Sequence, residues 1–498
     1  MRSRLLISSM ILAVGLTAAT AGPAPIYVDN IRGNDTYDGS RERPFASLEK
    51  ACRQVRTSGR IEVVNTGKPY QMPYDGPGRH GLRLRTGGTP DAPLVVEGNG
   101  AEISCLAVIP ATAWTREEER IYSLPFDPMS NMFRRDRTKD YWLDGTPIWF
   151  VDGRPAPNLH DRKTLKKTPG GFWWNKKERK VLYHLPAGQT LAGQKIELPA
   201  NYGFYIHRDY TIVRNFTVMF SWNDGFDAAE NPKGSMYINC LAYNSCGQGM
   251  SLHDAAAVTY LDCGAVNCAS SAVCNIGQSQ GVYQRCVLID NTFEAAVFLS
   301  DNAAALFEEC IIADPEPGEL IRQQRRSLGA FSNCVLLGRH GRNMVTVQAG
   351  TLSFFGCTML YGSSFCSFAP ADASGSISVR QSMLGNFSRC CVELPKFPNN
   401  MRIDLAANQY QPGTCHLSRN GKLIPGASPQ LAAWKIDLDS TVAELPLSGR
   451  RDCENPDASR RRSKRIGALL PKSVWQLYDR LKNFEATPAG IVRKKDAQ

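Results

Sequence analysis

Apolar and polar residues alternate with a period of two through the middle of the chain, in segments that recur about every 23 residues. Each segment has an aromatic residue three positions before a cysteine, as in YINCLAYN (237–244) and YQRCVLID (283–290). The repeat cysteines are spaced by 23, 23, 24, 24 and 23 residues: Cys240, Cys263, Cys286, Cys310, Cys334 and Cys357. Alternation predicts short strands. A repeat of this length built from short strands predicts a solenoid.

The class of solenoid follows by exclusion. Leucine-rich repeats share the repeat length, but their L-x-x-L-x-L-x-x-N pattern is absent, and helical repeats are longer with a 3.6-residue period. The sequence therefore predicts a parallel β-helix, in which equivalent residues of successive coils stack about 4.8 Å apart. Its coils supply strands to long parallel sheets.

In a β-helix the repeat cysteines form one inward-facing column of thiols, since free cysteine is among the most buried residue types. Their stacked Cβ atoms would be farther apart than the roughly 3.8 Å of a disulfide. The chain also has no C-x-x-C pair of the kind that binds zinc. We therefore expect a structural column. Pairing is left open for the remaining cysteines of interest: Cys246, Cys268, Cys390, Cys391, Cys415 and Cys453.

The early chain reads IYVDNIRGNDTYDGSRERPFASLEKACRQV (26–55). A short strand, a loop rich in Asn, Asp and Gly, a Pro-Phe pair and a short amphipathic helix resemble the opening of secreted right-handed parallel β-helix proteins, the pectin-lyase-like group. The resemblance covers roughly residues 26–105 and 200–410, and it implies a right-handed solenoid whose open end is plugged by the helix. An uncapped end would expose apolar core and strand edges. The expected buried face of the cap is Pro44, Phe45, Leu48, Ala51, Cys52 and Val55.

Residues 106–200 interrupt the repeat. YWLDGTPIWFVDGRP (141–155) places two Asp-Gly turns between aromatic strands, and FWWNKKERKVLYHLP (172–186) reads as another hairpin. Both are typical of a small antiparallel β-subdomain. It holds five of the eight tryptophans: Trp114, Trp142, Trp149, Trp173 and Trp174. Their rings can stack on sugars or fill a small core, and the core role is the more common.

The chain begins with the pattern of a secretion signal. Arg2 and Arg4 precede a short apolar stretch (5–16), and Ala19-Thr20-Ala21 fits a small-residue cleavage site. The stretch is short for a membrane span of about 20 residues. We therefore expect an exported, monomeric protein with no membrane span after cleavage. The predicted parts are the signal (1–21), the cap and first coils (22–105), the inserted subdomain (106–200), the main coils (201–410) and a C-terminal cover (411–498).

The net charge of +11 changes this picture little. Residues 460–498 hold eleven Lys and Arg against three Asp and Glu, so the body of the protein is nearly neutral. The basic run RRRSKR (460–465) reads as a solvated linker, and an amphipathic helix is expected near KSVWQLYDRLKNF (472–484). We expect no nucleic-acid partner for an exported chain.

One outer face of the predicted solenoid gathers the candidate chemistry. Aligning the coils on the cysteines superposes GFDAAE (225–230), GMSLHD (249–254), AVCNIG (272–277), AVFLSD (296–301) and LIRQQR (320–325). Alternation turns Phe226, Met250, Val273, Val297 and Ile321 inward, and Asp227, Ser251, Cys274, Phe298 and Arg322 outward. Two adjacent coils then bring together Asp227, Glu230, His253 and Asp254, beside Trp222, Asn223 and Asp224.

These residues suit a glycoside hydrolase. Such an enzyme needs two carboxyls flanking the scissile bond, about 5–5.5 Å apart for retention and about 6.5–9.5 Å for inversion. Glu230 and Asp254 occupy equivalent positions one coil apart, so their backbones should lie near 4.8 Å, and Asp227 with Asp254 would be wider. Either pair can serve, with His253 tuning one member. Trp222 and Asn223 are substrate-binding candidates beside them.

A polysaccharide lyase is the enzymatic alternative. It takes a proton beside a uronate carboxylate and neutralises that carboxylate with Ca²⁺ or with a basic side chain. His253 is the candidate base. The candidate neutralising groups are Asp224, Asp227 and Glu230 through bound Ca²⁺, or Arg322 and Arg325 by direct contact.

The same residue types are also common at coil corners, where Asp and Asn satisfy backbone groups. Corner roles are expected for Asn244, Asn267, Asp290 and Asp314. A glycan-binding protein without chemistry and a structural envelope protein therefore stay open beside the enzyme. The expected partner in the first two cases is a polysaccharide or other glycan.

Overall fold

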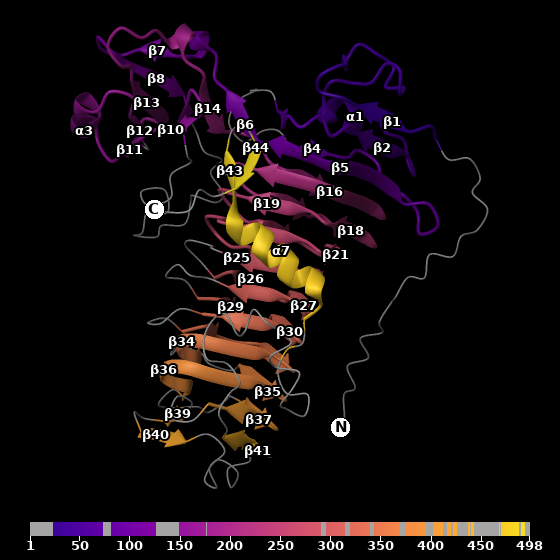
Figure 1. Cartoon of the computed structure of the whole chain (residues 1–498), viewed down its shortest axis with the longest axis vertical. Helices are drawn as coiled ribbons and strands as arrows, with labels where there is room; N and C mark the ends of the chain where they lie inside the picture. Colours follow the sequence, from indigo (N-terminus) through magenta and orange to yellow (C-terminus); the bar gives the residue numbers. More distant parts are fainter. Residues whose placement is uncertain are drawn as a thin grey trace.

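The chain folds as a long parallel β-helix with a small β-subdomain beside its N-terminal end (Figure 1). The computed structural model describes residues 23–72, 81–125, 149–175, 177–289, 295–313, 319–338, 343–368, 375–394, 402–411, 416–419, 422–425, 437–438, 440–442, 468, 470–487 and 490–493. The predictions for residues 1–21, Trp142, Asp290, Asp314, Cys415, Cys453 and the run 460–465 concern residues outside this set.

Each coil contributes strands to three parallel sheets. Sheet 1 contains β4 (Leu82–Arg83), β15 (Phe204–Ile206), β17 (Phe226–Ala228), β20 (Met250–Leu252), β23 (Val273–Asn275), β26 (Val297–Leu299), β29 (Ile321–Gln323) and β32 (Val345–Val347). Sheet 2 contains β1 (Ile26–Val28), β2 (Arg60–Val63), β18 (Ser235–Ile238), β21 (Ala257–Leu261), β24 (Gln280–Gln284), β27 (Ala304–Glu308), β30 (Leu328–Ser332), β33 (Thr351–Phe355), β35 (Ser376–Arg380) and β37 (Arg402–Ala406). Sheet 3 contains β3 (Tyr70–Gln71), β19 (Leu241–Tyr243), β22 (Gly264–Val266), β25 (Val287–Ile289), β28 (Ile311–Ala313), β31 (Val335–Leu337) and β38 (Gln409–Tyr410).

Four longer strands turn from one sheet into the next. β5 (Leu94–Ser104) and β16 (Thr211–Met219) pass from sheet 2 into sheet 3. β34 (Thr358–Phe368) and β36 (Met383–Leu394) pass from sheet 3 into sheet 1. The last coils are completed by β39 (His416–Arg419), β40 (Lys422–Pro425), β41 (Asp437–Leu438) and β42 (Thr441–Val442).

The interior consists of columns of identical or similar residues. The aromatic residues three positions before the repeat cysteines stack with ring centroids 4.6–5.1 Å apart, from Tyr237 through Tyr260 and Tyr283 to Phe354. The six repeat cysteines are buried and free, which confirms the predicted structural column. Their thiols lie near backbone carbonyls, as Cys263 Sγ does at 3.3 Å from Leu261 O. The predicted inward column beginning with Phe226 is also buried.

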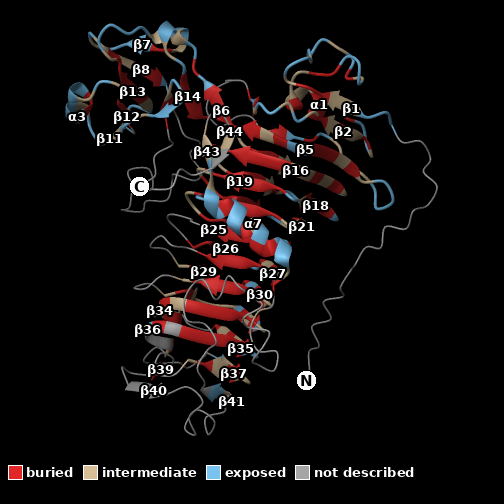
Figure 2. Cartoon of the chain, in the orientation of Figure 1, coloured by how far each residue is buried: buried red, intermediate tan, exposed pale blue. Residues whose placement is uncertain are grey.

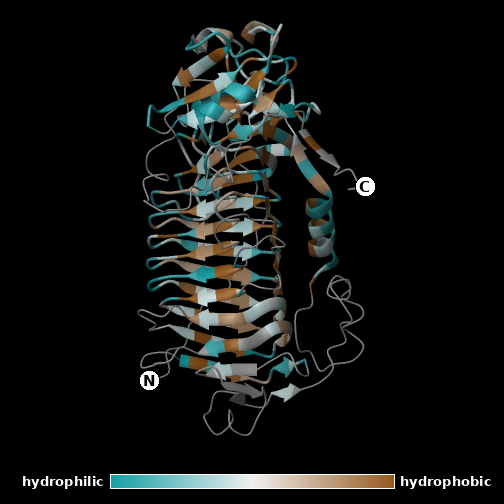
Figure 3. Cartoon of the chain, turned by 90° about the vertical axis from the view of Figure 1, so that its left-hand side faces the viewer, coloured by the Kyte–Doolittle hydropathy of each residue, from teal (hydrophilic) through white to brown (hydrophobic). Residues whose placement is uncertain are grey.

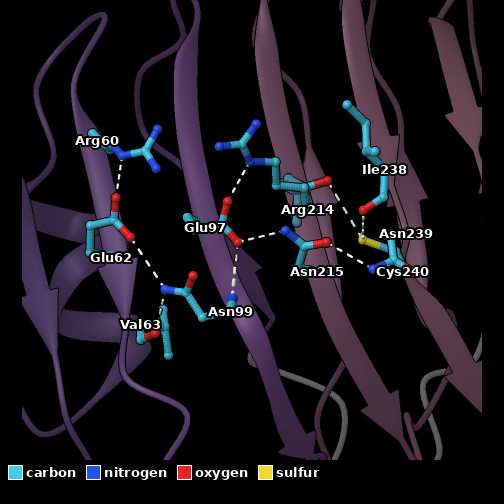
Figure 4. A network of polar contacts seen from close by, with 11 residues as sticks. Arg60, Glu62, Val63, Glu97, Asn99, Arg214, Asn215, Ile238, Asn239 and Cys240 are labelled. Atoms are coloured by element: carbon cyan, nitrogen blue, oxygen red, sulfur yellow. Dashed lines mark hydrogen bonds and ion pairs between the residues drawn. The ribbon is translucent and has the colours of Figure 1, made fainter.

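Polar side chains hold the bends between the sheets. Where sheet 2 turns into sheet 3, Asn239 Nδ2 donates to Asn215 Oδ1 at 2.8 Å and Asn215 Nδ2 donates to Glu97 Oε1 at 2.7 Å (Figure 4). At the corner that leads back to sheet 1, Asn267 Nδ2 donates to Asn244 Oδ1 at 2.6 Å. Both corner residues have a φ of 53°, a left-handed conformation that asparagine tolerates better than most residues. The predicted corner role of Asn244 and Asn267 is confirmed.

The N-terminal cap is helix α1 (Leu48–Gln54), which begins at Ser47, whose side chain accepts a hydrogen bond from Lys50 N. All six residues predicted for its buried face are buried. The cap is a single short helix, and it closes the first coil by packing on β1, β2 and β4.

The predicted inserted subdomain is present as two small, mainly antiparallel sheets. The first has the order β10 (Arg154–Pro155), β9 (Phe150–Val151), β14 (Ile196–Pro199) and β6 (Leu106–Val108). The second has the order β11 (Asn158–Leu159), β12 (Phe172–Asn175), β13 (Lys180–His184), β8 (Ile121–Pro125) and β7 (Thr115–Arg116), with helix α3 (Arg162–Lys167) against it. Trp149 stacks on Phe172 at 4.6 Å, and Phe172 stacks on Tyr183 at 4.4 Å. Trp149 and Trp114 are therefore core residues.

The predicted C-terminal helix is α7 (Lys472–Asn483), and it lies along the outer face of sheet 3 (Figures 1 and 3). Its buried residues Val474, Trp475, Tyr478 and Leu481 share one apolar cluster with side chains from β19, β22 and β25. Its exposed face points to solvent, while the strands beneath it are buried (Figure 2). A hairpin of β43 (Phe484–Thr487) and β44 (Gly490–Arg493) then reaches β5, where Glu102 Oε2 accepts from Ile491 N at 3.1 Å. No helix within the described residues is long and apolar enough to cross a membrane.

Candidate functional site

The candidate site lies on the outer face of sheet 1, near its N-terminal end. The strand register places Tyr205, Asp227, Ser251 and Cys274 side by side on successive coils, and Phe298 and Arg322 continue the column. This is the outward column predicted from the sequence. Arg83 on β4 extends it in the other direction, because Arg83 pairs with Tyr205.

Three side chains of this face converge. One side-chain ligand atom from each of Asp224, Asp227 and His253 lies within 4.8 Å of the other two. Asp227 comes from the middle of β17, His253 follows β20, and Asp224 lies in the corner that leads into β17. Gly225 and Phe226 separate the two aspartates. A Cβ at Gly225 would lie 2.7 Å from Ala242 Cβ and 2.9 Å from Gly249 O, so glycine lets the corner pack closely enough to bring both carboxyls together.

The two carboxyls differ in their hydrogen bonds. Asp224 is 1% exposed, and its oxygens accept hydrogen bonds from Gln248 N at 2.9 Å and Asn223 Nδ2 at 3.0 Å. The Asp227 side chain is 15% exposed. Its Oδ1 is buried and has no hydrogen-bond partner among the described residues. Since donors stabilise a carboxylate and their absence does not, Asp224 is the better placed of the two to carry the negative charge.

Burial changes the protonation of all three groups. It raises the pKa of Asp224 to about 7, against the hydrogen bond from Gln248 N. Burial, followed by the charge of Asp224, raises the pKa of Asp227 well above its usual range. The pKa of His253 is lowered by burial, which outweighs the opposing charge of Asp254. Two close carboxyls in a dry site cannot both ionise readily. At neutral pH the aspartate pair therefore holds at least one proton, beside a neutral imidazole.

Ser251, His253 and Asp227 resemble a Ser-His-Asp triad in composition but not in geometry. Ser251 Oγ lies 2.6 Å from His253 Nε2. Asp227 Oδ1 lies 3.8 Å from the same nitrogen. In a triad the carboxylate holds the other ring nitrogen, so that Nε2 can take the serine proton. Ser251 is also fully buried. The arrangement therefore orients His253 and does not activate a nucleophile.

Glu230 and Asp254 occupy equivalent positions one coil apart, as their spacing predicted, and both lie at coil corners just after a strand of sheet 1. Their φ values are 66° and 55°, and Asp254 Oδ2 accepts a hydrogen bond from Glu230 N at 2.8 Å. Glu230 is 45% exposed and forms ion pairs with Arg83 Nη2 at 2.9 Å and Arg208 Nη1 at 3.5 Å. Asp254 is exposed, and its charge contributes to the raised pKa of Asp227. The structure thus brings all four predicted catalytic residues to one locality, with distinct partners.

The predicted substrate-binding residues are distributed differently. Trp222 is 3% exposed and belongs to the core of the inserted subdomain. Asn223 lies at the site, holding Asp224. Arg322 is four strands from Asp227 in the column, roughly 19 Å away at the usual strand spacing, and it pairs with Glu319 at 3.2 Å. Arg325 pairs with Asp301 of the preceding coil. Arg322 and Arg325 are therefore remote from the aspartate pair.

Four residues beside the pair were not predicted: Arg83, Tyr205, His207 and Arg208. The Arg83 guanidinium lies over the Tyr205 ring at 5.1 Å, and the Tyr205 and His207 rings stack at 5.3 Å. A signal for Tyr205 was available, because NYGFYIH (201–207) and NDGFDAA (223–229) share the pattern N-x-G-F. That alignment places Tyr205 opposite Asp227 one coil earlier.

A cation is chemically possible at the converging groups. Asp224, Asp227 and His253 supply two carboxylates and an imidazole, a donor set that suits a divalent transition metal better than Ca²⁺, which prefers six to eight oxygens. Both oxygens of Asp224 already accept hydrogen bonds. The residues present fit the Ca²⁺ considered from the sequence only in part, with Asp227 as the carboxylate that has an unused oxygen.

Comparison with known proteins supports the architecture. Residues 202–393 match the family described as the right-handed β-helix region, so this part of the chain is a right-handed β-helix and the predicted hand is confirmed. Comparison with the curated proteins gave no match.

Similar solved structures include XylC in complex with xylose, at 10% identity over 84% of this chain and 86% of that chain, with a TM-score of 0.49. A rhamnogalacturonan lyase is 11% identical over 90% and 95% of the two chains, with a TM-score of 0.42. A lacto-N-biosidase from Eubacterium ramulus is 8% identical over 84% and 68%, with a TM-score of 0.33.

Proposed function

We propose that the protein is an exported glycoside hydrolase that cleaves a polysaccharide on the outer face of sheet 1, with Asp227 as the proton donor. The observation that carries the proposal is the Asp224–Asp227 pair, whose oxygens lie within 4.8 Å and whose pKa values are both raised by burial. A carboxyl that stays protonated near neutral pH is what a glycosidase needs to protonate the leaving oxygen.

The roles follow from the surroundings of each group. Asp227 is the partly exposed member and can reach a substrate, while Asp224 is enclosed. The ionised form of Asp224 is stabilised by Gln248 N and Asn223 Nδ2, and its charge keeps the proton on Asp227. Asp224 is thus a positioning residue, which acts through Asp227.

Asp254 is the carboxylate assigned to activate water. It is exposed, lies one coil from Asp227, and is held by Glu230 N through one oxygen. A carboxylate fixed in this way can accept a proton from a water molecule that attacks the sugar. His253, held by Ser251, lies beside Asp227 and stays neutral, because burial lowers its pKa.

The test is turnover by the purified protein on a panel of neutral and acidic polysaccharides, read as new reducing ends. We expect activity on at least one polymer, and a loss of about 10²–10⁴-fold in the Asp227→Asn variant, the usual contribution of a general acid. Asp262→Asn is the matched control, since Asp262 pairs with Arg285 away from sheet 1. Absence of reducing ends from every polymer, or equal loss in both variants, would contradict the proposal.

The stereochemistry of the product tests the assignment of Asp254. Attack by water gives inversion at the anomeric carbon, which NMR of the first product detects. Retention would instead point to a carboxylate nucleophile. It would overturn the role of Asp254 without affecting that of Asp227.

A cation-assisted lyase is the second candidate, favoured by the convergence of Asp224, Asp227 and His253 and by the unpartnered Asp227 Oδ1. A bound cation would neutralise the uronate carboxylate. A lyase would release products with an absorbing double bond and would lose activity in EDTA. Reducing ends without new absorbance, unaffected by EDTA, support the hydrolase.

A further inference from the structure

Two arginine side chains, Arg83 and Arg208, lie beside the aspartate pair at the outer face of sheet 1. Arg83 pairs with Tyr205, and Tyr205 pairs with Asp227, so the Arg83 backbone is about 10 Å from that of Asp227 at the usual strand spacing. Arg208 follows the same strand as Tyr205, and its Nε lies 3.4 Å from Arg85 O. Arg83 and Arg208 thus gather where the nearly neutral body of the chain gave no reason to expect them.

Glu230 is the carboxylate that forms ion pairs with these arginines. Its two oxygens face Arg83 Nη2 at 2.9 Å and Arg208 Nη1 at 3.5 Å. The three side chains are 57%, 48% and 45% exposed in the order Arg83, Arg208, Glu230. Exposed ion pairs of this kind contribute little to stability, so an incoming anion can replace Glu230 at small cost. The three side chains carry two positive charges and one negative charge, and the nearby Asp254 carboxylate is held on the Glu230 backbone nitrogen.

Arg83 is held in place by neutral neighbours. Its guanidinium lies over the Tyr205 ring, and its Nε lies 3.4 Å from His207 Nε2. His207 is 6% exposed. Burial, followed by the charges of Arg83 and Arg208, lowers the pKa of His207 to about 4, so the ring is neutral at physiological pH. A guanidinium that lies over the Tyr205 ring and donates to His207 is partly fixed before binding, so it offers its remaining donors with a smaller loss of side-chain entropy.

We infer that Arg83 and Arg208 form a subsite for an anionic substituent of the glycan, a carboxylate or a sulfate ester, and that Glu230 occupies this subsite until the substrate displaces it. The fork of an arginine matches both kinds of anion. This inference rests on the proposed function for the glycan and adds its class: an acidic polysaccharide whose charged sugar lies on the Arg83 side of the cleaved bond.

The test measures binding in the Asp227→Asn background, in which cleavage is expected to be about 10²–10⁴-fold slower. Affinity electrophoresis compares two pairs of polymers that share a backbone and differ in their charged substituent: polygalacturonate with its methyl ester, and dextran sulfate with dextran. We expect retardation by an acidic polymer, lost about tenfold in Arg83→Gln, the size expected for a charge-assisted hydrogen bond. We expect Glu230→Gln to bind that polymer several-fold more tightly, because the resident competitor is removed. Which acidic polymer responds separates carboxylate from sulfate.

Arg285→Gln is the matched control, since Arg285 belongs to an ion pair with Asp262 on another face. Tighter binding in Glu230→Gln is a readout that a merely structural role of Glu230 would not give. The inference is overturned if Arg83→Gln and Arg285→Gln lose binding equally, if Glu230→Gln weakens binding, or if each charged polymer binds no better than its neutral partner. Cleavage of a neutral polymer by the parent protein would overturn the subsite and leave the hydrolase intact.

Discussion

Sheet 1 and sheet 3 are built by the same repeat, yet their outer faces have opposite characters. Strands of sheet 3 such as β25 (Val-Leu-Ile) and β31 (Val-Leu-Leu) are apolar on both sides, and their outer side chains share one buried apolar cluster with α7, which packs on β22 and β25. The outward positions of sheet 1 hold Asp227, Ser251 and Arg322 among others. The repeat therefore fixes the inner face of each coil and leaves the outer face free to differ.

The difference separates stability from chemistry. On sheet 3 the outer side chains add buried apolar area, the main favourable term in folding. On sheet 1 the outer side chains include two carboxyls whose burial opposes ionisation, which costs stability at neutral pH. A change on sheet 3 should thus lower stability without affecting catalysis. A change at the aspartates should affect catalysis without lowering stability.

The largest effect on stability is expected for Leu481→Ala in α7. Leu481 is fully buried against sheet 3, and truncating a buried leucine costs roughly 2–5 kcal/mol of unfolding free energy. Urea unfolding measures the loss, with the half-buried Leu477 truncated as a control of smaller effect. Activity per folded molecule should be unchanged. A parallel loss of kcat at a temperature where the variant is fully folded would show that the two faces are coupled.

Much of the difference between sheets 1 and 3 can be predicted from the sequence. The cysteine period gave the coils, and alternation correctly turned Asp227 outward beside Ser251 and Cys274. The all-apolar strands VLI, IIA and VLL are typical of sheets covered on both sides, although no covered face was predicted from them. The amphipathic helix that covers it was predicted separately, but a hydrophobic stripe does not specify its partner.

The remainder of the site depends on distances that the repeat does not determine. Arg83 and Tyr205 pair across 122 residues, because the inserted subdomain separates their coils, so no constant spacing connects them. Asp224 is in a corner, where strand alternation makes no prediction about side-chain direction. Its approach to Asp227 depends on the close packing at Gly225. The ion pairs of Glu230 likewise depend on where the fold places Arg83 and Arg208.

The next largest effect is expected on the pH dependence of stability. The variant Asp224→Asn tests it, because it removes the buried ionisable group. The folded-state pKa of Asp224, about 7, lies above its ordinary value of 3.8, so the protonated form favours folding. The contribution of this carboxyl to the free energy of unfolding is fully present below about pH 4. It is lost as pH rises toward 7, by roughly 2–4 kcal/mol. The variant should lack this loss. Urea unfolding at pH 5 and pH 8 measures it, with Asp262→Asn as the control; equal pH dependence in the parent and Asp224→Asn proteins would contradict it.

A smaller effect tests how closely α7 fits sheet 3. A Cβ at Gly264 would lie 2.5 Å from Leu481 Cδ1, so Gly264→Ala should cost about 1–3 kcal/mol through overpacking. The same change in the Leu481→Ala background should cost much less, because the clashing atoms are gone. A double-mutant cycle measured by urea unfolding gives this coupling. Additive losses would mean that α7 does not rest on Gly264.

The smallest expected effect concerns the pH dependence of catalysis. With Asp227 as the acid, kcat/KM falls as pH rises through its raised pKa, because the proton to be donated is lost. Burial is the main cause of that raised pKa, and the charge of Asp224 is the second. Asp224→Asn removes the second cause alone, so the basic limb of the profile should move to lower pH by about one unit, equivalent to about 1.4 kcal/mol. Profiles of kcat/KM for the parent, Asp224→Asn and Asp262→Asn proteins measure this shift. An unmoved limb in Asp224→Asn would show that the charge of Asp224 does not help to keep Asp227 protonated. A limb that moves to higher pH would mean that the group titrating in catalysis is not an acid beside a negative charge, and the polar face of sheet 1 would then need another proton donor.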